Sequence, residues 1–263
     1  MAVLEEIDEF LNEWMPKLGA IARAGFGSAL EVRMKSPGQV VTDFDVRIEE
    51  QVAAEIRARW PDHALVGEEG GRRPGSGEFT WWIDPIDGTM NFVRGIPLFA
   101  VSIGVARHGR PVAGHVFDPL HEEHFRARAG GGAWLNERRI SVSGLERLID
   151  GNAHLEVTPG DAFLQRPAWL GRMHAACAKT RKLGALSLEL AYVAAGRAEL
   201  VAAGKSEPLC WWDICAGWAL IEEAGGIVVD LARAPIREAS TELVAGPPRL
   251  VDQFLALLDS PGR

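Results

Sequence analysis

The stretch FTWWIDPIDGTMNF, residues 79–92, constrains the fold of this chain more than any other segment. Its first part is rich in β-branched and aromatic side chains, which is typical of a buried strand. Two aspartates, Asp84 and Asp87, follow, and then a turn at Gly88 and Thr89. Carboxylates at the end of a buried strand are costly to desolvate unless positive charge lies nearby. The segment therefore predicts a sheet in which one strand ends at an acidic site.

Hydrophobic periodicity predicts both helices and strands along the chain. An amphipathic helix is expected over residues 3–26, with a kink allowed at Pro16. A second helix is expected from Asp43 to Trp60, capped by Thr42 or Asp43 and ended by Pro61. Strands are predicted within residues 63–71 and over 79–84, 99–107, 110–119 and 227–230, and further helices over 184–196, 213–226 and 248–258. Residues 145–178 show no clear pattern.

The segments 99–107 and 110–119 predict a hairpin about His108 and Gly109. Together with the helices, such hairpins indicate layered α and β elements, that is, an α+β class. The chain has 263 residues and contains no repeat and no linker longer than a loop. We therefore predict a single domain over residues 1–263, divided at most into subdomains at about 1–144 and 145–263.

Charge and composition exclude some classes of partner. The net charge is −8, and an acidic surface repels phosphate backbones, so we expect no nucleic-acid partner. No run approaches the roughly 20 apolar residues of a membrane span, and no signal peptide is evident. Three cysteines without a CxxC pair fit free thiols in a reducing cytosol, so a cytoplasmic protein is expected. An anionic substrate would need basic side chains or metal ions.

Acidic residues gather at the ends of the predicted elements. They are Asp43 with Asp45, Glu68 with Glu69, Asp84 with Asp87, and Asp213. Taken singly, such residues are usually turn formers, solvated loop residues or helix caps. Taken together, they offer the oxygen ligands that Mg²⁺ prefers, and the amides of Gly88 and Thr89 offer a seat for an anion. The combination indicates metal-assisted phosphoryl hydrolysis.

Three motifs resemble those of the inositol monophosphatase family, within the superfamily that includes fructose-1,6-bisphosphatase. They are VGEEGG (66–71), WWIDPIDGTMNFVRGIP (81–97) and WWDICAGWALIEEAGG (211–226). The likeness runs in order from about residue 3 to residue 260. It implies a layered α-β-α-β-α sandwich, magnesium dependence, lithium sensitivity and a homodimer.

The resemblance also implies roles for individual residues. The implied metal ligands are Glu68, Asp84, the Ile86 carbonyl, Asp87 and Asp213, with Asp45 at a weaker site. Thr89 and Glu68 would orient the attacking water, with Asp87 as a further catalytic residue. Asp87, Asp213 and the amides of Gly88 and Thr89 would contact the substrate, and Lys35 lies where the family often has a basic residue.

The side of the pocket that would hold the alcohol departs from the family pattern. The family has Ser or Thr and then Ala after glycine, whereas this chain has Gly184, Ala185 and Leu186. Gly184 and Ala185 are the implied substrate contacts there. Glu207 is the candidate for the family's inositol-contacting glutamate. The roles of Lys35, Arg181 and Glu207, and the effect of Ala185–Leu186, stay open.

The function expected from this pattern is a Mg²⁺-dependent phosphatase for a small polyol phosphate, by default inositol 1-phosphate. Histidinol phosphate, fructose 1,6-bisphosphate and 3'-phosphoadenosine 5'-phosphate are alternatives of the same class. A catalytically silent homologue that binds a phosphorylated metabolite is the alternative of another class. Phosphate monoesters hydrolyse very slowly without catalysis, which fits a demand for metal ions.

Several other features have simpler interpretations. His121 and His124 in HEEH are three residues apart, so a polar turn is favoured over a zinc site. Trp81, Trp82, Trp211 and Trp212 are expected to pack and to rigidify the site. The acidic pairs Glu49–Glu50 and Glu222–Glu223 are expected on exposed helix faces.

Overall fold

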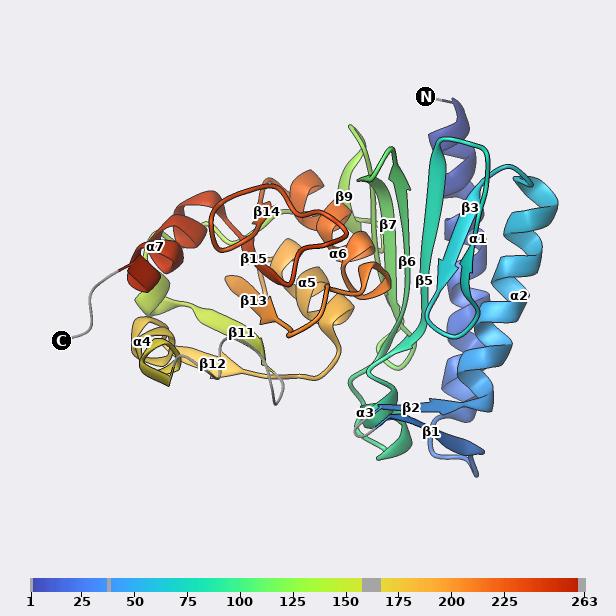
Figure 1. Ribbon diagram of the computed structural model, residues 1–263, viewed down its shortest axis with the longest axis horizontal. Coiled ribbons are helices and arrows are strands. Elements are labelled where there is room, and N and C mark those ends of the chain that lie inside the picture. Colours follow the sequence, from blue (N-terminus) through green and yellow to red (C-terminus); the bar gives the residue numbers. More distant parts are fainter. Residues whose placement is uncertain (1, 37–38, 158–166, 260–263) are drawn as a thin grey trace.

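The structure is a computed structural model that describes residues 2–36, 39–157 and 167–259. Its helices are α1 (Ala2–Gly25), α2 (Asp43–Arg59), α3 (Thr89–Val93), α4 (Pro167–Ala176), α5 (Leu186–Ala194), α6 (Trp211–Glu223) and α7 (Pro248–Asp259), with a 3-10 turn at Leu148–Asp150. Helices and sheets alternate in five layers: α1 and α2, a large sheet, α5 and α6, a small sheet, and α4 with α7 (Figure 1). The predicted layered α+β sandwich is confirmed.

The large sheet has eight strands in the order β10-β9-β8-β7-β6-β5-β3-β4. Its strands are β3 (Ala64–Gly67), β4 (Gly71–Arg73), β5 (Phe79–Asp87), β6 (Ala100–Arg107), β7 (Arg110–Asp118), β8 (Glu123–Arg128), β9 (Gly132–Leu135) and β10 (Arg138–Ile140). Only β3 and β5 pair in parallel within it. The hairpin of β6 and β7 is confirmed, and both His108 and Gly109 have positive φ, as its tight turn requires.

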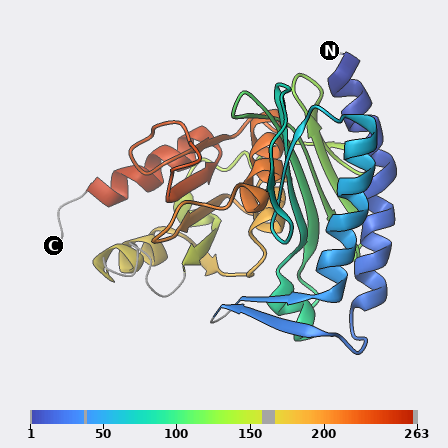
Figure 2. The same cartoon turned by 45° about the vertical axis from the view of Figure 1, so that its right-hand side comes forward.

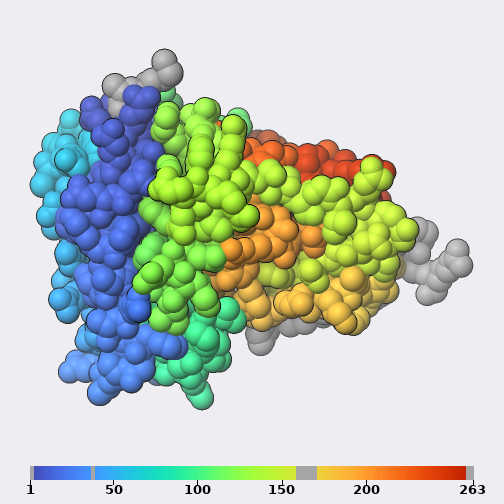
Figure 3. Space-filling view, turned by 180° about the vertical axis from the view of Figure 1, so that it is seen from behind, coloured from blue at the N-terminus to red at the C-terminus, as the bar shows by residue number. Residues whose placement is uncertain are grey.

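The small sheet has five strands in the order β12-β11-β13-β15-β14. They are β11 (Asn152–Val157), β12 (Lys179–Arg181), β13 (Leu200–Gly204), β14 (Ile227–Val229) and β15 (Glu242–Gly246). A separate hairpin of β1 (Val32–Ser36) and β2 (Gln39–Thr42) extends from the foot of α2, as Figure 2 shows in blue. Viewed from behind, α1 and the neighbouring strands of the large sheet form one wall, from which the rest of the chain projects (Figure 3).

The two tryptophans of β5 point to opposite faces of the large sheet. Trp81 packs with Phe79 and Ile83 in the core under α1 and α2. Trp82 belongs to the second core, under α5 and α6. Side chains alternate along a strand, so a run of apolar residues is required wherever both faces are covered.

A pair of glycines places α6 on the large sheet. Gly104 of β6 and Gly114 of β7 lie directly opposite each other in the register. A Cβ atom at Gly104 would lie 2.6 Å from the backbone nitrogen of Ala216, and one at Gly114 would lie 2.3 Å from its carbonyl oxygen. At Ala216, in its second turn, the backbone of α6 therefore rests directly on the sheet.

Most predicted boundaries agree with the structure. Helix α2 has Thr42 as its N-cap, one of the two residues expected from the sequence, and Asp45 completes a capping box with it. Helix α6 begins at Trp211, with Cys210 as its N-cap, so the predicted start at Asp213 was wrong by one half-turn. Among the described residues, no helix combines the length and apolar character of a membrane span.

Candidate active site

Parallel pairing brings Glu68 next to Asp84. Gly67 of β3 is in register with Ile83 of β5. One residue further on, the backbone N–H of Glu68 donates to the carbonyl oxygen of Ile83 at 3.1 Å. Glu68 therefore leaves the end of β3 beside the position where Asp84 projects from β5.

A β-bulge aims Asp84 and Asp87 at the same side of the sheet. Asp84 pairs with Ser102 and Asp87 with Ala100, so two residues of β5 oppose one residue of β6. In a regular strand, residues three apart point to opposite faces, and the bulge removes that alternation. Both carboxylates consequently point toward α5 and α6.

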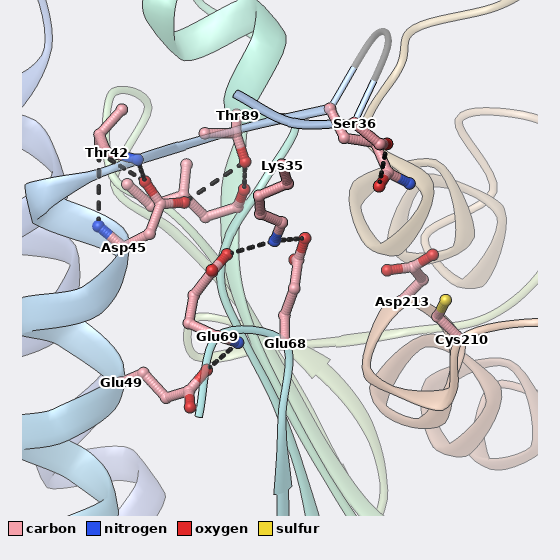
Figure 4. A network of polar contacts seen from close by, with 12 residues as sticks. Lys35, Ser36, Thr42, Asp45, Glu49, Glu68, Glu69, Thr89, Cys210 and Asp213 are labelled. Atoms are coloured by element: carbon pink, nitrogen blue, oxygen red, sulfur yellow. Dashed lines mark hydrogen bonds and ion pairs between the residues drawn. The ribbon is translucent and has the colours of Figure 1, made fainter. Parts of the chain in front are cut away.

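Asp213, in the first turn of α6, completes a group of three carboxylates. Ligand atoms of Glu68, Asp84 and Asp213 all lie within 4.8 Å of one another. Figure 4 shows Asp213 on one side of the site, with Glu68 and Glu69 on the other. An acidic residue in the first turn is favoured by the helix dipole, but at this position it also points into the cluster.

The electrostatics of this cluster fit a divalent cation. Asp84 is 2% exposed, and its Oδ1 has no hydrogen-bond partner among the described residues. Burial and the negative charge of Glu68 raise the pKa of Asp84 well above its usual range. Burial, with Asp213 nearby, raises the pKa of Glu68 to about 7. Three converging oxygen donors with an orphaned oxygen suit a hard divalent cation such as Mg²⁺.

Two lysines partly neutralise the cluster. Lys35 donates to Glu68 Oε1 at 2.7 Å and to Glu69 Oε1 at 2.6 Å (Figure 4). Lys205, which follows β13, donates to Asp213 Oδ2 at 3.0 Å. Burial lowers the pKa of Lys35, but its hydrogen bonds to both glutamates outweigh that effect and raise the pKa. The placement of Lys35 beside the site agrees with the sequence expectation, whereas Lys205 was missed.

Asp87 is bound to the N-terminus of α5. Its Oδ2 accepts hydrogen bonds from the backbone N–H of Ser187 at 2.7 Å, the Ser187 hydroxyl at 2.5 Å and the Leu188 N–H at 3.4 Å. Its Oδ1 accepts the Leu186 N–H at 3.2 Å. The N-cap, Ala185, has no side chain that could cap the helix. Asp87 does so from almost one hundred residues away, and it is not part of the three-carboxylate group.

The hydroxyl of Thr89 makes two polar contacts, one with Ile86 and one with Asp45. Thr89 Oγ1 lies 2.9 Å from the Ile86 carbonyl oxygen and 3.3 Å from Asp45 Oδ1. Its single proton can be donated to only one of them at a time. Asp45 also accepts the Thr42 N–H at 2.8 Å, and burial raises the pKa of Asp45 to about 6. These contacts link α2 to the turn after β5.

The residues predicted to contact the alcohol part of the substrate differ in exposure. Gly88 has φ of +87°, and a Cβ atom there would lie 3.1 Å from the Cβ of Ala185. Ala185 is fully buried against this turn, whereas Gly184 is exposed. Glu207 is exposed in the loop before α6. Arg181 donates to Asn152 at 3.0 Å.

Two helical glutamates were also missed by sequence reasoning. Glu49 was expected on an exposed face, but it is 6% exposed and binds the loop that carries Glu68 and Glu69. Glu189 is fully buried, and its Oε1 accepts the N–H groups of Leu183 and Gly184 at 2.6 and 3.2 Å. Burial, with Glu156 as neighbour, raises the pKa of Glu189 to about 10. The signal in both cases was an acidic residue on an apolar helix stripe.

The histidines lie away from this cluster. His115 is buried and bridges Asp8 of α1 and His124 of β8, at 3.0 and 2.9 Å. His121 binds Asp118 in the turn between β7 and β8. Within residues 2–36, 39–157 and 167–259, the only group of metal-ligating side chains found is Glu68, Asp84 and Asp213.

Comparison with known proteins places this geometry in a family. The model of the inositol monophosphatase family matches residues 3–260. The chain belongs to the inositol monophosphatase family. Two relatives with different names illustrate the similarity. An inositol-1-monophosphatase of Mesorhizobium japonicum is 40% identical over 224 residues, which are 82% of each chain. The Nus factor SuhB of Escherichia coli strain K12 is 37% identical over 232 residues, 87% of this chain and 85% of the relative.

Solved structures of this family share the fold. The extragenic suppressor protein suhB of Bartonella henselae superposes with a TM-score of 0.91 at 29% identity, covering 97% of this chain and 99% of that one. The IMPase of Thermotoga maritima superposes with a TM-score of 0.85 at 29% identity, covering 95% and 96%. Membership supports a phosphatase, and the substrate and metal are taken up below.

Proposed function

We propose that this protein is a Mg²⁺-dependent phosphatase of small polyol phosphates, with inositol 1-phosphate as the first substrate to test. The observation that carries the proposal is the convergence of Glu68, Asp84 and Asp213 within 4.8 Å, with Asp84 Oδ1 buried and unpaired among the described residues. Family membership adds the reaction class.

Glu68, Asp84 and Asp213 would hold the metal ion, with Asp87 and the Ile86 carbonyl as further ligands. Mg²⁺, when bound, supplies a Lewis acid for the phosphate oxygens and lowers the pKa of a water molecule. Thr89, whose hydroxyl is positioned by Ile86 and Asp45, would orient the attacking water together with Glu68. The amides of Gly88 and Thr89 would hold phosphate oxygens at the start of α3.

The charged groups around the cluster suit a phosphate dianion only when the carboxylates are neutralised. Glu68, Asp84 and Asp213 repel an anion, and Lys35 and Lys205 are already paired with acidic side chains. A bound divalent cation reverses this local field. We propose that the protein acts in the cytoplasm as a homodimer, without nucleic-acid or membrane partners.

A substrate panel tests the proposal. Release of phosphate from inositol 1-phosphate, histidinol phosphate, fructose 1,6-bisphosphate and 3'-phosphoadenosine 5'-phosphate is measured with Mg²⁺ and with chelator. We expect metal-dependent release from at least one ester, and loss of that activity in Asp84→Asn. No release from any ester, together with no Mg²⁺ binding by calorimetry, would instead favour a silent metabolite-binding homologue. Some relatives are named Nus factors rather than phosphatases, so the experiment also tests the alternative of a silent homologue.

A further inference from the structure

Glu49 lies beneath the loop that carries the first acidic residues of the site. It projects from α2 toward the end of β3 and is 6% exposed. Its Oε2 accepts the N–H of Glu69 at 2.9 Å (Figure 4), and its Oε1 accepts the N–H of Gly70 at 2.6 Å. One carboxylate therefore satisfies two successive backbone donors of the loop, and such charge-assisted bonds are the stronger kind.

The glycines of VGEEGG leave room for this side chain. A Cβ atom at Gly67 would lie 2.2 Å from Glu49 Oε1, and one at Gly70 would lie 2.5 Å from the same oxygen. Neither glycine has a positive φ, so backbone conformation does not require glycine there. Space for the Glu49 carboxylate is the reason that the structure offers for both.

Helix α2 carries a second anchor on the same face. Asp45 precedes Glu49 by four residues, which places the two side chains one above the other along the helix. Asp45 contacts the Thr89 hydroxyl, as Glu49 contacts the loop after β3. The capping box of Thr42 and Asp45 fixes the start of this helix. Helix α2 thus contacts both the loop after β3 and the turn after β5.

We propose that Glu49 is a positioning residue that anchors residues 68–70 and thereby fixes Glu68 for metal binding. This inference rests on the proposed function for its metal, but the anchor itself is a property of the metal-free chain. Glu49 touches neither Asp84 nor Asp213 in the described contacts, so its effect passes through the loop. Partners of this kind change metal affinity or activity by about 10- to 100-fold when removed.

The first test compares Glu49→Ala and Glu49→Gln with the wild-type protein. Calorimetry should show that Mg²⁺ binding weakens by about 10- to 100-fold in E49A, and by less in E49Q, which keeps one acceptor oxygen. The Mg²⁺ half-saturation of the phosphatase should rise more than the substrate KM. In the metal-free proteins, hydrogen exchange of the Glu69 and Gly70 amides should accelerate by at least about tenfold in E49A.

Glu50 provides a matched control. It carries the same charge, and with Glu49 it lines the cavity of about 530 Å³ between the β1–β2 hairpin and α2. It is exposed and makes no hydrogen bond to residues 68–70. Glu50→Ala should bind Mg²⁺ and exchange these amides like wild type. If E49A, once folded, matches E50A in both readouts, Glu49 is not an anchor.

The glycine at 67 gives an independent test. Gly67→Ala should lower Tm in the wild-type background because its Cβ meets Glu49, and should lower it much less in the E49A background. An equal loss in both backgrounds would overturn the close approach on which the inference depends. Wild-type protein without phosphatase activity would reject the proposed function, but the exchange and Tm readouts would still decide on the anchor.

Discussion

Asp87 shows how a single carboxylate serves two parts of the molecule. Ser187 and its two neighbours in α5 direct three N–H groups and one hydroxyl at it. Burial raises the pKa of Asp87 to about 7, and Asp213 contributes in the same direction. As a helix cap it is fully engaged, so any metal that it binds must share oxygens already accepting hydrogen bonds. Its proposed role as a metal ligand and its role as a helix cap are therefore coupled.

Asp87→Asn should lower activity by about 100-fold or more, because an amide is a weak Mg²⁺ ligand and its NH₂ faces the donors of α5. It should also destabilise the fold by about 1–3 kcal/mol through unpaired buried donors. Ser187→Ala removes one donor only and should change stability without abolishing activity. Initial rates and urea unfolding measure both effects. An Asp87→Asn enzyme with wild-type turnover would exclude Asp87 from the site.

Sequence motifs located Glu68, Asp84 and Asp213, but not the side chains that pack around them from outside those motifs. Glu68 and Asp84 were predictable because each follows an apolar strand within a recognised motif. Glu49 and Lys205 were not, because their environment depends on which helix or loop packs over the strand end. The Glu49–Glu50 pair was interpreted as a solvated helix face, although Glu49 lies on the apolar stripe of α2 with Ile48 and Val52, and the loop after β3 covers it.

At the scale of elements, helical carboxylates repeatedly hold glycine-rich loops. Glu49 of α2 holds Glu69 and Gly70, and Glu223 of α6 accepts the N–H groups of Gly130 and Gly132 at 2.9 and 2.8 Å. Glycine-rich loops have few side chains to satisfy their own backbone donors, so a carboxylate from a neighbouring helix stabilises them. Such a helix cannot shift without moving its loop.

Helix α6 packs most closely against the large sheet where it crosses the glycine pair of β6 and β7. Gly114→Ala should destabilise the fold by about 1–3 kcal/mol, because the new Cβ meets the backbone of Ala216 rather than a flexible side chain. Displacement of α6 should also weaken Mg²⁺ binding through Asp213. Gly144→Ala is the control, since nothing lies within 4 Å of its Cβ position. Equal urea midpoints for the two variants would contradict this packing.

For the whole molecule, the acidic cluster opposes folding until its charge is neutralised. Burial and like charges raise the pKa of Glu68 to about 7 and raise that of Asp84 well above its usual range, so the folded state holds protons that the unfolded chain releases at about pH 4. These groups therefore reduce the stability of the metal-free protein as pH rises through about 4 to 7. Protons and Mg²⁺ compete for the same oxygens.

The rise in Tm produced by Mg²⁺ should accordingly be larger at about pH 8 than at about pH 6. At one hundred times its Kd, the ion should add about 2.7 kcal/mol to the free energy of unfolding. Thermal melts with Mg²⁺ or chelator at both pH values measure the effect. Asp84→Asn should remove most of it, and an identical rise at both pH values would argue against titration of the cluster.

The order of layers was implied by the resemblance to the family, and the hydrophobic periods predicted many of the helices and strands, whereas the structure of residues 145–178 could not be predicted. That region contains β11 and α4 and is followed directly by β12, and residues 158–166 lie outside the described structure. The three-residue strand β12 is mostly exposed, so its sequence shows no apolar alternation. Its pairing with β11 depends on register against a strand more than twenty residues earlier.

The order in which the layers are synthesised has a consequence for the nascent chain. The large sheet is complete at Ile140, but α5 and α6, which cover one of its faces, begin only at Leu186 and Trp211. Trp82, Val116 and Phe125 lie on that face. While the ribosome translates the intervening residues, these apolar side chains are not yet covered by α5 and α6. Chaperone binding during translation should therefore peak before residue 211 has emerged from the exit tunnel.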